Sequence, residues 1–220
     1  MLNTTQLHAV IIDLDGTMVD TRGDFVAALN ATLSELGLPP RIDLAFVERT
    51  VGKGSEHLIR ATLLHVGAAP TLFDAAWAHY QEHYTQINGQ HAEVYPGVTE
   101  GLVNMRKHGL KIACLTNKPS AFARQLLRLT RLDGYFTVVF GGDAHKRQKP
   151  DPLPVLRTCE AMLSDPARTL IVGDSSNDAI AARAAGCPVV LVTYGYNHGE
   201  PIRSVDADGY IDRLDALVLA

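Results

Sequence analysis

The sequence contains few cysteines and no closely spaced pair of them. Its three cysteines, Cys114, Cys159 and Cys187, are far apart in the chain and lie in apolar or small-residue surroundings. This spacing does not match a disulfide framework, a zinc site or a CxxC redox motif. We therefore expect three reduced thiols that pack in the interior.

The sequence also lacks a basic excess, a long apolar run and a leader-like beginning. Its formal net charge is -4, whereas a nucleic-acid-binding surface needs clustered Lys and Arg. No apolar run approaches the roughly 18 residues that span a bilayer, and MLNTTQLHAV has no basic segment before an apolar core. We expect a cytoplasmic protein, monomeric or homodimeric, that binds neither nucleic acid nor membranes.

Short apolar runs alternate with helical patterns along most of the 220 residues. The runs are rich in β-branched residues and show little polar alternation, as is typical of parallel strands buried on both faces. We expect strands at 8–15, 111–117, 135–142, 169–175, 188–195 and, more weakly, 208–214. Helices are expected at 98–109, 120–132, 151–163 and 176–186. This repetition predicts an α/β fold with a Rossmann-like parallel sheet.

The interval from about Asp20 to His91 breaks this alternation. It shows helical periodicity without a convincing strand, and Gly and Pro separate the helical stretches. The four helices are expected at 24–37, 43–52, 55–67 and 72–86. We therefore expect two domains, joined by hinges at 18–24 and 92–98. They are an α/β core of residues 1–19 plus 96–220 and a helical cap of residues 20–95 inserted after the first strand.

Polar residues follow the expected strands where ligands of parallel sheets bind, beyond the carboxyl ends. They are Asp13 and Asp15, Thr116 and Asn117, Lys149, and Asp174 with Asp178. Each of them alone could be a turn former, a helix cap or a surface residue. Buried carboxylates are costly without a positive partner, however, so their convergence predicts a hard divalent cation at this edge of the sheet.

Four motifs in this order resemble the haloacid dehalogenase-type phosphohydrolase superfamily. They are DLDGT at 13–17, LTN at 115–117, KPDP at 149–152 and GDSSND at 173–178. The resemblance implies covalent phosphoryl transfer on a small phosphorylated metabolite. Asp13 would be the nucleophile that forms an aspartyl-phosphate intermediate. Asp15 would protonate the leaving alcohol and then deprotonate the attacking water.

The resemblance also implies how phosphate is held. The glycine at Gly16 would let backbone N–H groups approach the phosphate oxygens closely. The hydroxyl of Thr116 and the amide of Asn117 would donate hydrogen bonds to the transferring group. Lys149 would neutralise negative charge on the phosphate and on the nucleophile.

Mg²⁺ is the cofactor that the resemblance implies. Its ligands would be Asp13, the backbone carbonyl of Asp15 and Asp174, and Asp178 would join or orient this ligand set. Because residues two apart on a strand share a face, we expect the Asp13 and Asp15 side chains to lie together.

Longer matching stretches resemble the phosphoglycolate phosphatase subgroup of the superfamily. They include TVGKG, YPGV, LTNKP, KPDPLP and GDSSNDAIAARAAGCPVVLVTYGYN. The expected activity is hydrolysis of a small phosphate monoester, foremost 2-phosphoglycolate, with Arg49 or Lys53 of the cap as candidates to hold the substrate carboxylate. TYGYN at 193–197 is expected to border the site.

Other functions stay open at this point. A phosphosugar mutase of the β-phosphoglucomutase type shares the cap position and Asp15, and another small phosphate or pyrophosphate is a possible substrate. A third alternative is a binding module without catalytic activity. The presence of all the polar residues named above argues against it. Phosphonate-cleaving members of the superfamily use a cap lysine covalently, but they lack an aspartate at the position of Asp15. We therefore expect no covalent role for Lys53.

Overall fold

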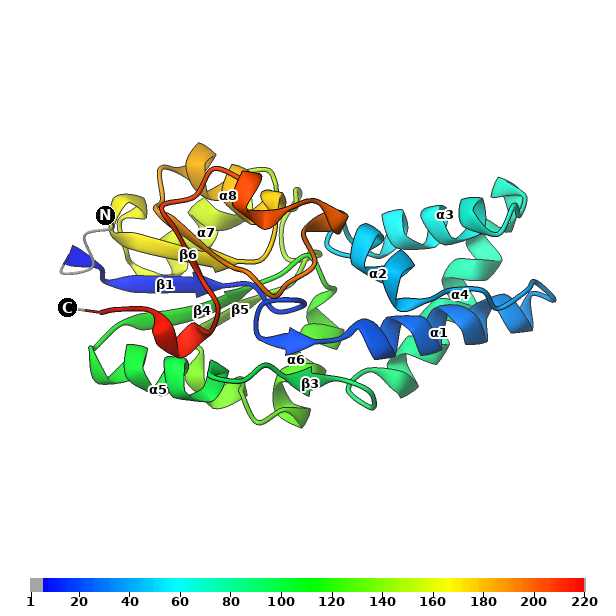
Figure 1. The fold of residues 1–220 in the computed structure, drawn as a ribbon, viewed down its shortest axis with the longest axis horizontal. Helices are drawn as coiled ribbons and strands as arrows, with labels where there is room; N and C mark the ends of the chain where they lie inside the picture. Colours follow the sequence, from blue (N-terminus) through cyan, green and yellow to red (C-terminus); the bar gives the residue numbers. More distant parts are fainter. Residues whose placement is uncertain (1–5, 220) are drawn as a thin grey trace.

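Six parallel strands form the central sheet in the order β5-β4-β1-β6-β7-β8 (Figure 1). The computed structural model describes residues 6–219. The strands are β1 Ala9–Ile12, β4 Lys111–Leu115, β5 Val138–Phe140, β6 Thr169–Gly173, β7 Val189–Val192 and β8 Gly209–Ile211. Every pairing in this sheet is parallel, so all the carboxyl ends lie at one edge, which faces the inserted helices in Figure 1. The predicted α/β fold is confirmed.

Helices cover both faces of the sheet. They are α5 Val98–Lys107, α6 Ser120–Leu129, α7 Leu153–Met162 and α8 Ser176–Ala185. Alternate residues of β1 serve the two layers: Val10 and Ile12 belong to the apolar cluster that includes α5 and α6. Ala9 and Ile11 belong to the cluster that includes α7 and α8. Burial on both faces explains why the strands read as unbroken apolar runs.

Four helices lie beyond the carboxyl edge of the sheet, on the right of Figure 1. They are α1 Arg22–Glu35, α2 Leu44–Thr50, α3 Ser55–His65 and α4 Phe73–Ile87. Their apolar faces form a cluster of their own, in which the predicted helical periodicity of this interval is realised. Phe122 of α6 and Tyr196, which follows β7, also belong to this cluster and connect it to the sheet.

A short antiparallel ribbon joins the two regions and was not predicted. It consists of β2 Val19–Asp20 and β3 Glu93–Val94, with Val19 opposite Val94. Strands of two residues are too short to show a period in the sequence. The ribbon lies within both predicted hinge segments, so the chain leaves and re-enters the sheet region at one place.

The strands of the structure are shorter than predicted, mainly at their carboxyl ends. β1 ends at Ile12 and not at residue 15, and β4 ends at Leu115 and not at residue 117. Asp13 and Thr116 each still donate one hydrogen bond to the neighbouring strand, to the carbonyls of Val172 and Phe140, and the residues that follow them form turns and side-chain hydrogen bonds. The polar ends are therefore loops that the strands position.

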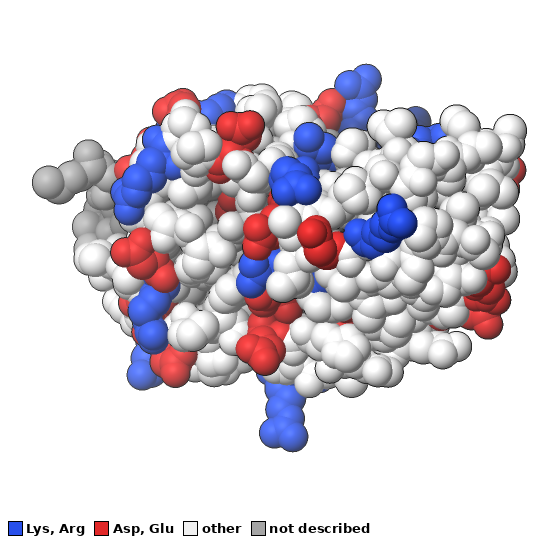
Figure 2. Space-filling model, turned by 45° about the vertical axis from the view of Figure 1, so that its right-hand side comes forward, with Lys and Arg blue, Asp and Glu red and all other residues white. Residues whose placement is uncertain are grey.

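Short 3₁₀ turns complete the chain. They are η2 Pro70–Leu72, η3 Asp133–Tyr135, η4 Pro166–Arg168, η5 Asn197–Gly199, η6 Ile202–Ser204 and η7 Leu214–Ala216. Cys114, Cys159 and Cys187 are free and buried, as predicted. Within residues 6–219, no helix has the length and hydropathy needed to cross a bilayer. On the face shown in Figure 2, basic and acidic side chains are interspersed along the middle of the molecule.

Candidate active site

The chain turns sharply directly after Asp13, where β1 has ended. The N–H of Met18 donates to the carbonyl of Leu14 at 2.9 Å and closes this turn. Gly16 has a φ of +81°, and a Cβ atom at this position would lie 2.2 Å from Oδ2 of Asp174. Glycine is therefore required here, both for the backbone conformation and for the close approach of a carboxylate.

Asp13 and Asp15 line the same pocket, as predicted, but strand alternation is the wrong reason. Both residues lie beyond the end of β1, and Asp15 forms an isolated bridge with Val19 inside the turn. The hydrogen bond from the N–H of Asp13 to the carbonyl of Val172 in β6 holds Asp13, and the turn that follows positions Asp15.

The pocket lies between the carboxyl edge of the sheet and the inserted helices. Asp13, Asp15, Thr116, Asn117 and Asp174 line it from the sheet side. Phe25, Tyr80 and Tyr84 line it from α1 and α4. Polar groups thus gather at one wall of the pocket and aromatic rings at the other, a common arrangement for sites that bind small ligands.

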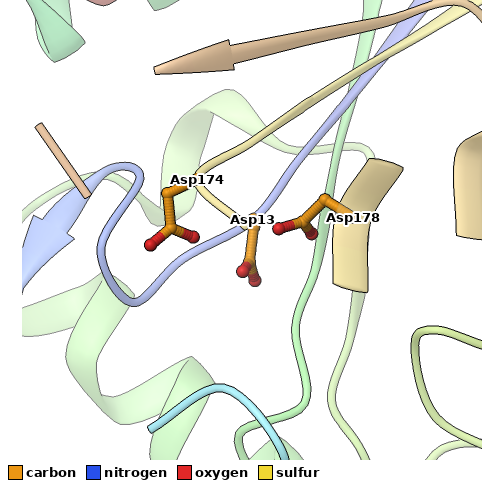
Figure 3. A group of neighbouring side chains, drawn as sticks. All are labelled: Asp13, Asp174 and Asp178. Carbon is orange, nitrogen blue, oxygen red and sulfur yellow. The ribbon is translucent and has the colours of Figure 1, made fainter. Parts of the chain in front are cut away.

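Three carboxylates converge at the polar wall. Asp13 follows β1, Asp174 follows β6 and Asp178 lies in the first turn of α8, and one oxygen of each lies within 4.8 Å of the others (Figure 3). Thr17 Oγ1 donates to Oδ1 of Asp174 at 3.2 Å, and the N–H of Tyr196 donates to its Oδ2 at 2.8 Å. The predicted convergence of these three acids is therefore present in the structure.

Burial changes the protonation of this acidic cluster. Burial raises the pKa of Asp13 to about 7, with Lys149 opposing the shift and Asp178 adding to it. Burial, followed by repulsion from Asp178 and Asp13, raises the pKa of Asp174 well above its usual value. Clustered acids with raised pKa values are typical of functional sites and favour binding of a cation.

Lys149 is the buried cation of this group. Its Nζ lies 3.0 Å from Oδ1 of Asp13, donates to Oδ1 of Asp178 at 2.6 Å and donates to the carbonyl of Leu115 at 2.9 Å. Burial alone would lower the pKa of Lys149, but Asp13 and Asp178 outweigh it and raise that pKa. The lysine therefore stays charged between two carboxylates.

One cation does not satisfy all the acidic oxygens. Oδ1 of Asp13 is buried and faces the Lys149 ammonium at 3.0 Å, an ion-pair contact that lacks the geometry of a hydrogen bond. Both oxygens of Asp178, in contrast, have partners: Oδ1 accepts from Lys149, and Oδ2 accepts from the hydroxyl of Ser175 at 2.8 Å. The site thus offers acceptor oxygens on Asp13 and Asp174, while Asp178 is held by the protein.

Asn117 and Thr116 follow β4. The amide nitrogen of Asn117 donates to the carbonyls of Gly52 and Lys149, both at 2.8 Å, and its Oδ1 accepts from the N–H of Lys149 at 3.1 Å. In this arrangement the Asn117 amide fixes the Lys149 loop against the inserted segment. Thr116 lines the pocket, and its Oγ1 accepts a hydrogen bond from the N–H of Lys118 at 3.2 Å.

Lys118 is a site residue that the sequence analysis does not select. Its Nζ donates to Oδ1 of Asp15 at 3.1 Å, and the side chain is 2% exposed. Thr21 Oγ1 donates to the same oxygen of Asp15 at 2.7 Å. The signal was its place in LTNKP, one residue beyond two predicted site residues, but a strand-end lysine is usually read as exposed.

The two cap residues proposed for substrate binding lie outside the pocket lining. Arg49 is exposed at the end of α2 and lies against Gly199. Lys53 is exposed and lines a neighbouring, wider hollow. Of the TYGYN segment, Tyr196 and Asn197 line the pocket, as predicted.

Comparison with known proteins agrees with this geometry. The model of a family described as haloacid dehalogenase-like hydrolase matches residues 10–192. The phosphoglycolate phosphatase of Thiobacillus denitrificans is 41% identical over 212 residues, which cover 94% of this chain and 92% of that protein. The plasmid-borne phosphoglycolate phosphatase of Cupriavidus necator is 43% identical over 211 residues, covering 95% and 90%.

A solved structure shares the architecture over almost the whole chain. The crystal structure of a predicted phosphoglycolate phosphatase from Haemophilus somnus superposes with a TM-score of 0.92 and 29% identity, covering 97% of each chain. The family match runs from the second residue of β1 to the end of β7 and includes all the acidic residues of the site. The chain belongs to the haloacid dehalogenase-like hydrolase family.

Proposed function

We propose that this protein is a Mg²⁺-dependent phosphatase that hydrolyses 2-phosphoglycolate to glycolate and phosphate. One observation carries the proposal: Asp13, Asp15 and Asp174 line one wall of the pocket, and the buried Lys149 contacts Asp13. Similarity to proteins named phosphoglycolate phosphatase supports the choice of substrate.

In the first step Asp13 attacks the phosphorus atom of the ester. A bond forms between a carboxylate oxygen and phosphorus while the bond to the ester oxygen breaks, and Asp15 gives its proton to the leaving oxygen. In the second step water attacks the aspartyl phosphate, Asp15 takes a proton from that water, and phosphate and the Asp13 carboxylate are released. Thr21 and Lys118 both donate hydrogen bonds to Oδ1 of Asp15, which leaves Oδ2 for the proton transfers.

The surrounding groups hold the transferring phosphoryl group. The hydroxyl of Thr116 donates to its oxygens, and Lys149 offsets its charge. The N–H groups of Gly16, Thr17 and Met18, expected to approach the phosphate, donate instead to the carbonyls of Val19 and Leu14 within the turn. Asn117 contributes by fixing the Lys149 loop, since its amide is already bonded there. Positive groups arranged before reaction stabilise charge in the transition state at little cost of reorganisation.

The acidic residues fit a magnesium ion. Within residues 6–219, Oδ1 of Asp13 is buried with an ion-pair contact to Lys149 but no hydrogen bond of normal geometry, and the nearby oxygens of Asp174 are of the hard type that Mg²⁺ prefers. Asp13, Asp174 and the backbone carbonyl of Asp15 would hold the ion, and Asp178 would orient the set through Lys149 and Ser175. When bound, the ion would neutralise charge on the phosphoryl oxygens.

We also propose that residues 1–19 plus 96–220 act as a core domain and residues 20–95 as a cap domain. The separate apolar cluster of the inserted helices and the β2–β3 ribbon at the junction support this division. A cap that opens admits substrate, and a cap that closes excludes water from the aspartyl phosphate.

Phosphate release from a panel of small esters tests the proposal. The panel contains 2-phosphoglycolate, several hexose phosphates and pyrophosphate, each with and without Mg²⁺. We expect the highest kcat/KM for 2-phosphoglycolate and no release after chelation of the metal. Isomerisation of a hexose phosphate without phosphate release would establish a mutase instead.

A further inference from the structure

Lys118 is a buried cation whose task in the proposed mechanism is limited to a hydrogen bond with Oδ1 of Asp15. Its Nζ contacts Asp15, donates to the hydroxyl of Tyr84 on α4, and lies 4.7 Å from the ring centroids of both Phe25 and Tyr84. An ammonium group has three N–H donors, and the described contacts use two of them. The amine therefore lies at the boundary between sheet and inserted helices, with capacity for one more acceptor.

We propose that Lys118 binds the carboxylate of the substrate and so selects phosphate esters that carry an acid. This inference rests on the proposed function and deepens it. In 2-phosphoglycolate the carboxyl carbon is two bonds from the ester oxygen that Asp15 protonates. A cation 3.1 Å from the carboxylate of Asp15 is therefore within reach of that group.

Charge balance in the pocket supports the same role. Among residues 6–219 the Lys118 ammonium has one ion-pair partner, Asp15, whose Oδ1 also accepts a hydrogen bond from Thr21. Asp24 provides no second partner, because its two carboxylate oxygens accept from the backbone N–H groups of Gly89 and His91 at 2.6 and 2.7 Å. An incoming carboxylate therefore gains a charge-assisted hydrogen bond from Lys118 that a neutral ester cannot match.

Lys118 also differs from the exposed cap cations in its preorganisation. Two aromatic rings and a hydroxyl already hold its amine in the pocket, whereas Arg49 and Lys53 are exposed. A cation that is ordered before binding loses less conformational entropy when it captures an anion. The selectivity is thus built into the loop after β4.

Matched substrates separate this role from simple positioning of Asp15. The two substrates are 2-phosphoglycolate and the analogue in which a carboxamide replaces its carboxylate. For K118M we expect kcat/KM for the acid to fall about 10- to 100-fold relative to that for the amide, the usual effect of a lost charge-assisted hydrogen bond. K118R should restore part of the preference for the acid.

Thr21→Val is the matched control. It removes the other hydrogen bond to Oδ1 of Asp15 and leaves the lysine in place, so it should affect both substrates equally. Equal losses of acid and amide in K118M would overturn the inference. Wild-type protein gives a test that needs no variant: glycolate should inhibit more strongly than glycolamide, and equal inhibition would also overturn it.

The outcomes distinguish this inference from the proposed function. If the wild type hydrolyses 2-phosphoglycolate and K118M loses both substrates alike, the function stands and the role of Lys118 is wrong. If the wild type prefers another acid-bearing ester and K118M loses that preference, the role stands and the substrate assignment is wrong. Hydrolysis of neutral esters alone would contradict both.

Discussion

At the scale of single residues, Asp13 combines an unfavourable environment with the central chemical role. Its carboxylate is buried between Lys149 and two other acids, and burial raises its pKa to about 7. A carboxyl group whose pKa is higher in the folded than in the unfolded chain lowers the free energy of unfolding when it ionises. For Asp13 this loss of stability begins as the pH rises above 3.8, the ordinary pKa of the group. Its presence is therefore better explained by function than by folding.

The Asp13→Asn substitution should separate these two effects. We expect kcat to fall at least about a thousandfold, because an amide cannot form the phosphorylated intermediate. The midpoint of thermal unfolding should stay the same or rise, since a buried negative charge is removed. Activity assays and thermal melts of the same preparation measure both, and an unfolded variant would show that Asp13 is structural.

Lys149 should behave in the opposite way. Lys149→Met leaves Asp13 and Asp178 without their shared cation, so we expect a loss of about 3–5 kcal/mol in the free energy of unfolding as well as loss of turnover. Lys146→Met, an exposed lysine of the same loop, is the control and should change neither. Denaturant unfolding measures the difference. Equal stability of the two variants would argue that Lys149 does not hold the acids together.

At the scale of elements, most of the architecture could be predicted because the sheet is buried on both faces. Each predicted strand and helix of the core is present, since an unbroken apolar run followed by an amphipathic stretch has few other solutions. The carboxyl ends of strands could not be predicted, because the side chains of Asp13 and Asp15 pair with Lys149 and Lys118, which are remote in the sequence. The β2–β3 ribbon was missed because each strand has two residues and the two lie at opposite ends of the inserted segment.

The site residues also differ in whether they could be predicted from the sequence or only from tertiary contacts. Acids at strand ends could be placed together from the parallel topology alone. Lys118 could not, because its burial depends on Tyr84 and Phe25, which lie on helices remote in the sequence. Arg49 and Lys53 were proposed from charge and position, and no sequence pattern indicates that they are exposed outside the pocket lining.

The inserted helices depend on their own apolar cluster, and neighbouring leucines of α3 test this. Leu63 is 3% exposed within that cluster, whereas Leu64 is 81% exposed. Leu63→Ala should lower the free energy of unfolding by about 2–4 kcal/mol, and Leu64→Ala by less than about 0.5 kcal/mol. Denaturant unfolding of both variants gives the comparison. Similar values for the two would contradict the packing of α3.

At the scale of the whole molecule, a cation at the acidic cluster should couple metal binding to stability. Mg²⁺ that binds the folded chain alone raises the unfolding temperature. Because burial raises the pKa of Asp13 to about 7, its carboxylate is largely protonated below that pH and charged above it. The stabilisation by Mg²⁺ should therefore grow as the pH rises towards 7 and then level off.

Thermal melts with and without Mg²⁺ across this pH range measure the effect. Asp174→Asn should abolish most of the shift, because it removes a carboxylate that no protein cation pairs within the described residues. An equal shift in that variant would place the metal elsewhere.

The most direct measurement is the site of phosphorylation during a single turnover. The protein is mixed with 2-phosphoglycolate and Mg²⁺, quenched in acid within one turnover, digested and analysed by mass spectrometry. The account predicts one phosphoryl group on the peptide that contains Asp13, and none in Asp13→Asn. A phosphoryl group on any other residue, or hydrolysis that persists in Asp13→Asn, would contradict it.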